Sequence, residues 1–285
     1  MKLLKKWFVA QKDWIFTHNM KKVVLITGVS SGFGKSSAEL LAANGHIVYG
    51  TIRKECAISP SVKLLQMDLT DPASIKKAVD QVIAEQGRID VLINNAGMHL
   101  GGPIEEAPEE LFKKQLETNI NGLVYMLQAT LPYMRNHKHG TIVNFGSIGG
   151  LMGLPFQPFY SASKFAIEGI SEALRMEVKA FGIRVVVINP GDFATSNTAN
   201  RTNITVAGGP YEEQFRKSQA QFEKDEINGW DPIIMAKVML KIVEKRRPCN
   251  RYIVASFEQK LAIFLKRILP ISWFAAILSD HYKIK

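Results

Sequence analysis

The chain has 285 residues, of which 46% are hydrophobic and 22% charged, and this composition fits a single globular core. Its net charge of +10 is concentrated in lysines and arginines near the two ends, and the middle has no basic–aromatic motif, so we expect no nucleic-acid partner. The two cysteines and six histidines form no ligand pattern; we therefore expect no metal site, no structural disulfide and a cytoplasmic, reducing compartment.

Short apolar runs alternate with longer helical patterns along most of the chain. The apolar runs predict strands at 22–27, 46–51, 62–67, 90–94, 140–146, 183–189 and 250–255. The helical patterns predict helices near 34–44, 71–86, 108–134, 159–181 and 231–246. Strands that are separated by helices pair in parallel. The expected fold is therefore α/β: a doubly wound Rossmann fold with a seven-stranded parallel sheet flanked by helices, in one domain over residues 21–256.

Two basic, amphipathic segments flank this domain, at residues 1–20 and 257–285. The first has too short an apolar core for a secretory signal; it is a native extension, a helix packed on its own domain, or a stretch that precedes a true start at Met20. The second is predicted to be helical and carries an apolar stripe with Trp273 beside lysines. For both segments, peripheral binding to an anionic membrane and coverage of the substrate pocket are alternatives that stay open, and for the second so is coverage of a subunit interface.

The first predicted strand ends in a glycine-rich turn, T-G-V-S-S-G-F-G, at residues 27–34. A helical pattern follows at once, and this strand–turn–helix context is typical of a site for a dinucleotide pyrophosphate. Gly28 permits the tight turn, Gly32 leaves room for the phosphates, and Gly34 allows close packing of helix on strand.

The segment after the second predicted strand indicates which dinucleotide is bound. An NAD site usually has an acidic residue there, whereas this chain has Ile52, Arg53 and Lys54. The guanidinium of Arg53 is suited to pair with a 2′-phosphate, so the pattern favours NADP(H) over NAD(H). The alternative is an arginine that is simply solvated at the end of a strand.

Tyr160 and Lys164 are four residues apart in the run Y-S-A-S-K, downstream of a lone serine, Ser147. On a helix, this spacing puts both side chains on one face. A fixed ammonium beside a phenol favours the phenolate, so we expect the pKa of Tyr160 to be lowered from its usual value of about 10. An exposed aromatic beside a solvated lysine is the alternative interpretation of this pair.

Further motifs follow the glycine turn in chain order. They are N-N-A-G (94–97), N-I-N-G (119–122), Ser147, Y-S-A-S-K (160–164) and P-G-D-F-A-T (190–195). In this order and spacing the chain resembles the classical short-chain dehydrogenase/reductase family over residues 21–255. In detail it is similar to the 17β-hydroxysteroid-dehydrogenase-like and retinol-dehydrogenase-like members.

The resemblance implies a group of four catalytic residues. Tyr160 would exchange a proton with the substrate oxygen, and Lys164 would lower the tyrosine pKa and hold the nicotinamide ribose. Ser147 would fix the substrate oxygen, and Asn119 would hold a water that links Lys164 to solvent. The residues implied in cofactor binding are Thr27, Gly28, Ser30, Ser31, Gly32, Phe33, Gly34, Arg53, Asp68, Leu69, Asn94, Ala96, Gly97, Tyr160, Lys164, Pro190, Gly191, Phe193 and Thr195.

The resemblance also implies an activity, the interconversion of a carbonyl and an alcohol with NADP(H) on a lipophilic substrate such as a steroid, a retinoid or a sphingoid ketone. Residues 192–230 would form a lid over that substrate. Two alternatives stay open: a 3-oxoacyl-thioester reductase, and a non-enzymatic NADP(H)-sensing regulator on the same fold. Because relatives pair through helices that correspond to 108–134 and 159–181, a homodimer or homotetramer is expected.

Overall fold

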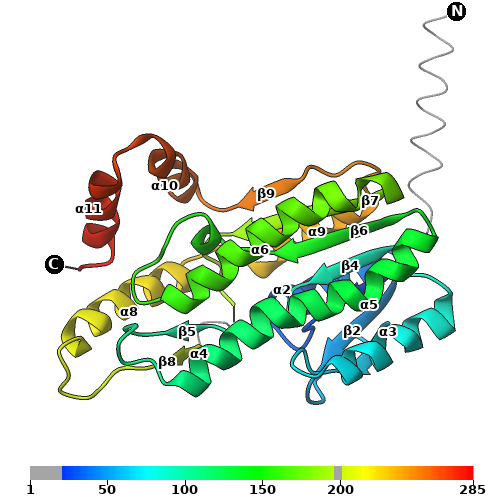
Figure 1. The fold of residues 1–285 in the computed structure, drawn as a ribbon, viewed down its shortest axis with the longest axis horizontal. Coiled ribbons are helices and arrows are strands. Elements are labelled where there is room, and N and C mark those ends of the chain that lie inside the picture. Colours follow the sequence, from blue (N-terminus) through cyan, green and yellow to red (C-terminus); the bar gives the residue numbers. More distant parts are fainter. Residues whose placement is uncertain (1–20, 196–200, 285) are drawn as a thin grey trace, which may run out of the picture.

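The computed structural model of the protein describes residues 21–195 and 201–284. The segment predicted as a basic extension at residues 1–20 lies outside these residues, as do residues 196–200 of the predicted lid. At the centre is a seven-stranded parallel sheet with the strand order β3-β2-β1-β4-β6-β7-β9 (Figure 1). The strands are β1 Val23–Ile26, β2 Ile47–Ile52, β3 Val62–Gln66, β4 Val91–Asn94, β6 Gly140–Phe145, β7 Ile183–Pro190 and β9 Arg251–Val254. All seven predicted strands are confirmed, and so is the predicted fold class.

The strand order reverses beside β1. This strand pairs with β2 on one side and with β4 on the other, so the chain first builds one half of the sheet outward through β3 and then returns to build the other half. Ligands of open α/β sheets bind at such a switch point, in the crevice outside the carboxyl ends of the strands. The topology therefore already fixes where a site is expected.

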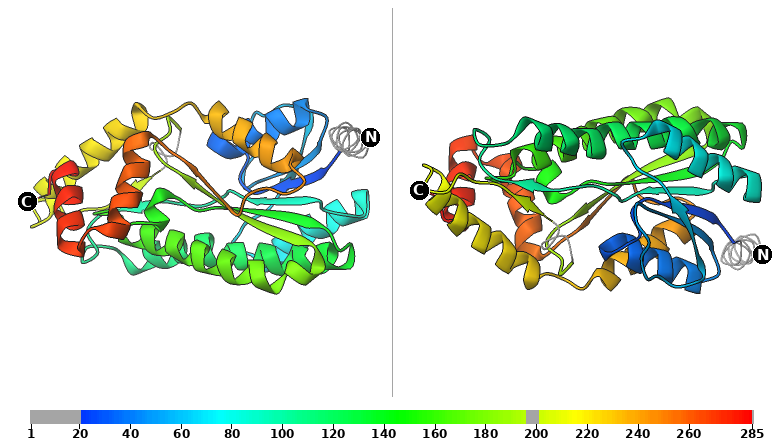
Figure 2. Two further views of the ribbon diagram at one scale, coloured as in Figure 1. Left: turned by 90° about the horizontal axis from the view of Figure 1, so that it is seen from above. Right: turned by 90° about the horizontal axis from the view of Figure 1, so that it is seen from below.

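Helices cover both faces of the sheet and make a three-layer structure (Figure 2). One face is covered by α2 Gly32–Ala43 and α9 Pro232–Glu244. The other is covered by α3 Pro72–Gln86, α4 Glu109–Leu116, α5 Gly122–Asn136 and α6 Pro158–Glu177. Each helix that was predicted inside the domain is present, although one of them is interrupted.

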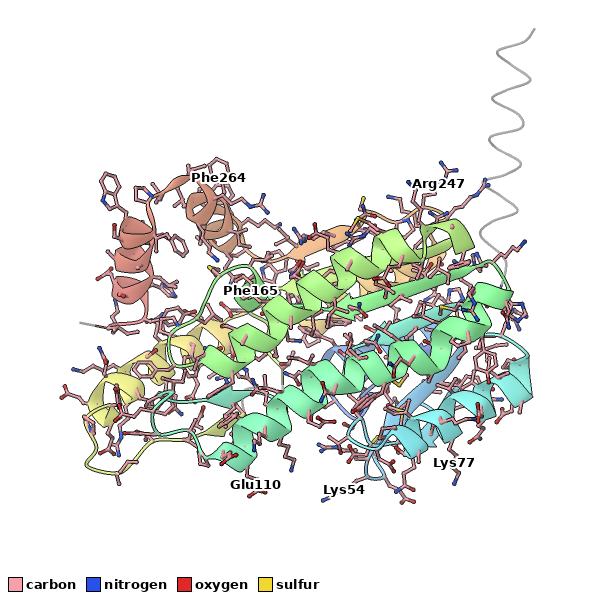
Figure 3. The ribbon with its side chains drawn as sticks, in the orientation of Figure 1. Lys54, Lys77, Glu110, Phe165, Arg247 and Phe264 are labelled. Carbon is pink, nitrogen blue, oxygen red and sulfur yellow. The ribbon has the colours of Figure 1, made fainter. Side chains whose placement is uncertain are left out.

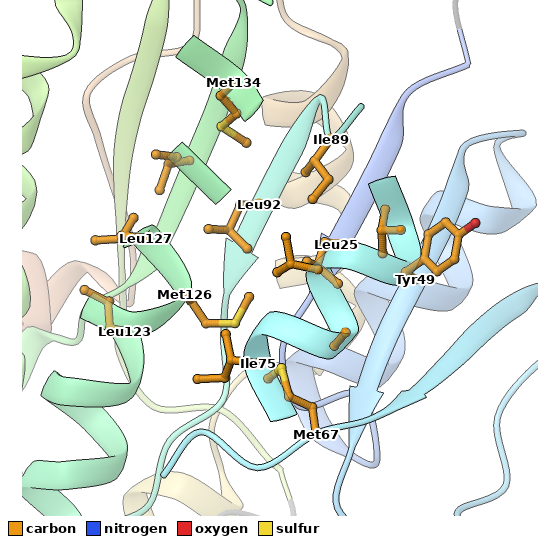
Figure 4. Close-up of a cluster of buried hydrophobic side chains, with 14 of the residues drawn as sticks. Leu25, Tyr49, Met67, Ile75, Ile89, Leu92, Leu123, Met126, Leu127 and Met134 are labelled. Atoms are coloured by element: carbon orange, nitrogen blue, oxygen red, sulfur yellow. The ribbon is translucent and has the colours of Figure 1, made fainter. Parts of the chain in front are cut away.

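Alternate residues of the strands enter two separate apolar layers. In β1, Val23 and Leu25 belong to the cluster under α3, α5 and α6, whereas Val24 and Ile26 belong to the cluster under α2 and α9. Figure 4 shows the first cluster, in which Leu92 of β4 lies among side chains of the covering helices. Because helices cover both faces of the sheet, the strands appear in the sequence as continuous apolar runs. This explains why the predicted strand bounds agree closely with those in the structure.

The predicted helix 108–134 is wrong in one respect. A π-helical turn, Glu117–Asn121, separates α4 from α5. Such turns are rare and often occur at functional sites. This one contains Asn119, whose side chain is turned inward and hydrogen-bonded to Met98 in the loop after β4, a contact that helical periodicity does not reveal.

Several elements that gather beyond the carboxyl ends of the strands lie outside the predicted pattern (Figure 1). A two-stranded parallel sheet pairs β5 Leu100–Gly101 with β8 Thr202–Asn203, and α8 Glu212–Ile227 occupies much of the predicted lid.

The C-terminal extension is helical, as predicted, and forms α10 Phe257–Ile268 and α11 Ile271–His281. In the part of the chain that the structure describes, no helix is long and apolar enough to cross a membrane.

The helix α8 was missed because it is mostly polar. Only Phe215, Ser218 and Phe222 are buried, and this narrow stripe carries little periodic apolar signal. Its exposed face is instead stabilised by pairs four residues apart, including Glu212 with Arg216 and Glu213 with Lys217.

Candidate active site

A cavity of about 600 Å³ runs along the carboxyl ends of the strands, from the glycine turn after β1 to Tyr160 on α6. It brings together most of the residues that the sequence singled out. Those in its lining are Gly28, Ser30, Ser31, Gly32, Phe33, Arg53, Asp68, Leu69, Ala96, Gly97, Ser147, Tyr160, Lys164, Pro190, Gly191, Phe193 and Thr195. Four of the singled-out residues lie outside this lining: Thr27, Gly34, Asn94 and Asn119.

The glycine turn has a shape that only small residues permit. Gly28 and Gly32 have φ angles of 72° and 55°, in the left-handed region. A Cβ atom on Gly34 would lie 2.0 Å from the carbonyl oxygen of Gly28, so the first turn of α2 folds directly onto the loop. Close packing at Gly34 was predicted against the strand, whereas the atoms that it approaches belong to the loops after β1 and β4.

The turn is also tied to the end of β4. The Thr27 hydroxyl oxygen accepts hydrogen bonds from the backbone N–H groups of Asn95 and Ala96, each at 3.0 Å. The Asn95 side-chain amide donates in return to the carbonyl oxygens of Thr27 and Gly28, at 3.0 and 2.9 Å. Thr27 therefore supports the cavity wall from behind, and Asn95 holds both loops in place while lining the cavity itself.

The amino end of α2 opens into the cavity. Its N-cap residue, Ser31, makes no side-chain capping bond, and no acidic residue lies in the first turn. The first N–H groups of a helix lack partners within the helix, and the helix dipole makes that end electropositive. This end of the cavity is thus suited to a phosphate group.

Arg53 lines the far side of the same region, directly after β2, and its side chain is exposed. Asp68, after β3, lies on the same wall. Hydrogen bonds from Thr70, first from its backbone N–H group, hold the pKa of Asp68 below its usual value, so its carboxylate stays charged. The region combines a cationic and an anionic side chain beside the glycine turn.

The predicted catalytic side chains converge at the other end of the cavity. Ser147 follows β6, and Tyr160 and Lys164 share one face of α6. The Ser147 and Tyr160 hydroxyl groups are hydrogen-bonded. The Lys164 ammonium donates to the backbone oxygen of Phe145 at 2.8 Å and lies 5.6 Å from the centre of the Tyr160 ring.

The expected lowering of the Tyr160 pKa is wrong for this structure. Burial raises the pKa of Tyr160, and the hydrogen bond with Ser147 offsets only part of this effect. Burial also lowers the pKa of Lys164, to about 8, so the ammonium is itself held in a poorly solvating environment. The loss of solvation outweighs the attraction that the sequence suggested, and Tyr160 is a phenol that keeps its proton at neutral pH.

Asn119 lies behind the catalytic side chains. Its side-chain oxygen accepts from the N–H group of Met98 at 2.8 Å, and its amide donates to Met98 O and Ser163 Oγ. Together with Lys164 and Asn94 it lines a second cavity of about 10 Å³, which is the size of one water molecule. Within the described residues, the side-chain oxygen of Asn94 has no hydrogen-bond partner. A water held there is consistent with the role predicted for Asn119, which stays a prediction.

The structure separates Asn94 from the main cavity. Its side-chain amide donates to Asn144 across β4 and β6 at 2.9 Å, between the strands. The cavity position that was expected for it is held by Asn95, the next residue of the N-N-A-G motif. The motif alone indicates that Asn94 and Asn95 cannot both face the cavity, because the side chains of neighbouring residues at a strand end point in opposite directions.

Other residues of the lining were not predicted. At the catalytic end they include His99, Gln157, Asp192, Glu226 and Tyr282. Tyr282 follows α11, so the C-terminal extension contributes to the cavity wall. These residues come from five separate segments, and no local pattern in the sequence connects them.

Comparison with known proteins agrees with this geometry. The family model for short chain dehydrogenases matches residues 22–204. The chain belongs to this family. It is 46% identical over 266 residues to a 3-ketodihydrosphingosine reductase of Bacteroides thetaiotaomicron, covering 93% of this chain and 99% of that protein. It is 35% identical over 258 residues to human 17-beta-hydroxysteroid dehydrogenase type 1, covering 81% of this chain and 77% of that protein.

Solved structures support the same assignment. The crystal structure of a short-chain dehydrogenase from Streptomyces avermitilis matches with a TM-score of 0.77 at 29% identity, covering 93% of this chain and 97% of that one. As a member of this family, the protein is an oxidoreductase that interconverts carbonyl and alcohol groups.

Substitution of Gly34 by alanine tests the packing of the glycine turn. We expect Gly34→Ala to lower the free energy of unfolding by about 2 kcal/mol, because the added methyl group meets backbone at 2.0 Å. Gly153→Ala is the matched control, since nothing lies within 4 Å of a Cβ atom there and its φ angle is not positive. Urea unfolding followed by fluorescence measures both, and equal stabilities for the two variants would contradict this packing.

Proposed function

We propose that the protein is an NADP(H)-dependent reductase of a lipophilic ketone. The observation that carries the proposal is the continuity of the main cavity, which joins a glycine turn and Arg53 at one end to Ser147, Tyr160 and Lys164 at the other. When bound, a nicotinamide nucleotide supplies the hydride. The residues of the chain bind and orient the reactants and deliver the proton.

The protonation state of Tyr160 is that of a proton donor. At neutral pH the phenol keeps its hydrogen, and Tyr160 donates that hydrogen to the oxygen of the ketone. Ser147, already hydrogen-bonded to Tyr160, holds the same oxygen. Lys164 carries a positive charge that stabilises the tyrosinate as the proton leaves, and the small cavity beside Asn119 and Asn94 provides a place for the water that restores the proton.

The phosphate end supports NADP(H) over NAD(H). Arg53 lines the cavity beside the glycine turn, and its guanidinium is exposed and available to a 2′-phosphate. The next basic residue, Lys54, is exposed but lies outside the cavity lining.

The substrate end supports a lipid-like ligand. Apolar side chains from four segments line it, namely Ile148, Leu154, Phe193 and Phe222. The bacterial relative named above is called a 3-ketodihydrosphingosine reductase, and a long-chain ketone of that kind suits such a wall. In this proposal, α8, with Phe222 and Glu226, is the main part of the lid.

We further propose that α10 and α11 rest on an anionic membrane surface from which the substrate enters. Their inner residues Ile263 and Phe274 are buried against Ile148 and Met152 beside the cavity. Their outer faces expose large apolar side chains, and Figure 3 shows Phe264 on the outer side of α10. The exposed set is Phe257, Leu261, Phe264, Ile268, Ile271, Trp273 and Ile277, with Lys260 and Arg267 among them. A homodimer or homotetramer through α4, α5 and α6 stays a prediction.

The role of Tyr160 is tested by Tyr160→Phe, which removes only the hydroxyl group. We expect kcat to fall by about 10²–10⁴-fold while the Kd for NADPH is unchanged, because general acid catalysis is lost and the ring remains. Tyr133→Phe is the control, since its hydroxyl contacts Asp80 at 3.2 Å, outside the cavity lining. Full activity of Tyr160→Phe would remove the residue from the mechanism.

The reading of the 2′-phosphate is tested by Arg53→Asp. We expect the ratio of kcat/KM for NADPH to kcat/KM for NADH to fall by about 10- to 100-fold, because a charge-assisted hydrogen bond is lost. Lys54→Asp makes the same change of charge one residue away and should leave the ratio nearly constant. If both variants shift the ratio equally, the effect comes from net charge, and Arg53 does not specifically recognise the 2′-phosphate.

Membrane docking is tested by co-sedimentation with phosphatidylglycerol vesicles. We expect the double variant Phe264→Glu, Trp273→Glu to lose most of its binding, because 56% and 66% exposed apolar residues become anionic. The double variant Leu64→Glu, Ile104→Glu changes the charge equally at exposed positions outside α10 and α11. Equal sedimentation of the two double variants would exclude the C-terminal helices as the docking surface.

A further inference from the structure

A histidine that the mechanism above does not use lies against the catalytic tyrosine. The rings of His99 and Tyr160 stack with their centres 3.9 Å apart and an angle of 14° between their planes. His99 is 5% exposed and belongs to the cavity lining. Its ring is therefore part of the cavity wall beside the catalytic tyrosine.

The surroundings of His99 fix its tautomer. The Nε–H group of Arg201 lies 3.3 Å from Nδ1 of His99, and a guanidinium can only donate, so Nδ1 accepts. Burial and the charge of Arg201 hold the pKa of His99 well below its usual value, against a smaller opposite effect of the Gln157 side chain. The imidazole is therefore neutral, and its hydrogen is on Nε2.

Arg201 is itself held in place. It forms an ion pair with Glu226 of α8, and its guanidinium lies 4.5 Å from the centre of the Phe222 ring. Glu226, Arg201 and His99 thus form a chain of contacts from the lid to the catalytic tyrosine. At the end of this chain, Nε2 of His99 is buried. The Gln157 side chain interacts weakly with the imidazole, but among the residues that the structure describes Nε2 has no partner in a well-formed hydrogen bond. A buried donor without a partner is costly unless a ligand satisfies it.

A hydrogen-bond acceptor lies in the same part of the cavity. Asp192 follows β7, lines the cavity, and accepts a hydrogen bond from the side-chain amide of Gln259 at 2.5 Å. No lysine or arginine within residues 21–195 and 201–284 forms an ion pair with it. Burial, and then the charges of Asp225 and Glu226, raise the pKa of Asp192 to about 7, and the charge of Arg201 and the hydrogen bond from Gln259 offset only part of this effect.

We propose that His99 and Asp192 form a polar subsite that selects a ketone with an amino group and a hydroxyl group near the reacting carbonyl. Asp192 pairs with the protonated amine, and the Nε2–H group of His99 donates to the hydroxyl oxygen. The apolar wall then holds the alkyl chain. This inference rests on the proposed reductase function and narrows its substrate to amino ketones of the sphingoid type, as distinct from steroids or oxoacyl thioesters.

The test compares three ketones of equal chain length with NADPH as reductant: 3-ketodihydrosphingosine, its analogue without the amine, and its analogue without the 1-hydroxyl group. Each is assayed with the wild type and with Asp192→Asn, His99→Phe and Asp80→Asn. His99→Phe keeps a ring against Tyr160 and removes the donor. Asp80→Asn is the control, because Asp80 pairs with Lys76, does not line the cavity and is not among the charges that act on Asp192.

We expect the wild type to prefer the parent ketone over each analogue by about 10- to 100-fold in kcat/KM. Asp192→Asn should lose the preference for the amine and keep that for the hydroxyl group, and His99→Phe should do the reverse. Asp80→Asn should keep both. Each preference is a ratio measured within one variant, so a loss of folded enzyme cancels.

Two results would count against these proposals, and they are distinguishable. If the wild type reduces all three ketones equally, or if both cavity variants keep both preferences, the subsite is excluded and the reductase function stands. If the wild type oxidises no NADPH with any ketone although it binds the nucleotide, the proposed function itself fails.

Discussion

The loop after β1 and the loop after β4 lie in direct contact, and the rest of the site depends on this contact. Thr27 and Asn95 exchange hydrogen bonds across it, and a Cβ atom on Gly28 would lie 2.8 Å from that of Ala96. Because the strand order reverses beside β1, the contact lies at the switch point of the sheet, and its residues Gly28, Asn95 and Ala96 line the main cavity. The cavity extends from this contact to the amino end of α2 on one side and to the face of α6 that carries Tyr160 and Lys164 on the other.

Burial sets the chemistry at the catalytic end. It raises the pKa of Tyr160, lowers that of Lys164 and raises that of Asp192, so each group is moved toward its neutral form. In such a site the phenol keeps its proton. A charged form of Asp192 is stabilised when a bound ligand carries the opposite charge. The same physical effect therefore acts both on the proton donor of the proposed reaction and on the carboxyl group that is proposed to bind the substrate amine.

The sequence predicted the sheet well because its strands are buried on both faces and are separated by regular helices. It also placed the glycine turn, Arg53, Ser147, Tyr160 and Lys164 in one site, because short motifs at strand ends are brought together by the topology itself. It failed where a property depends on distant segments. The direction of the Tyr160 pKa shift depends on burial, and the π-helical turn at Asn119 depends on the loop at Met98.

The same limit applies to the substrate end of the cavity. His99 and Arg201 are 102 residues apart in the chain and have no shared motif, and α8 has a narrow apolar stripe. Only the folded chain brings Glu226, Arg201 and His99 into contact beside Tyr160. Family membership fixes the reaction type, whereas we propose that these contacts help to select the substrate.

The most direct test is a crystal structure of the protein with NADPH. We expect the diphosphate at the amino end of α2, the 2′-phosphate beside Arg53, and the nicotinamide ring within contact of the Tyr160 hydroxyl group, with Lys164 bonded to the adjoining ribose. A nucleotide bound in another place, or a Tyr160 hydroxyl group directed away from the nicotinamide ring, would contradict the proposed reductase site.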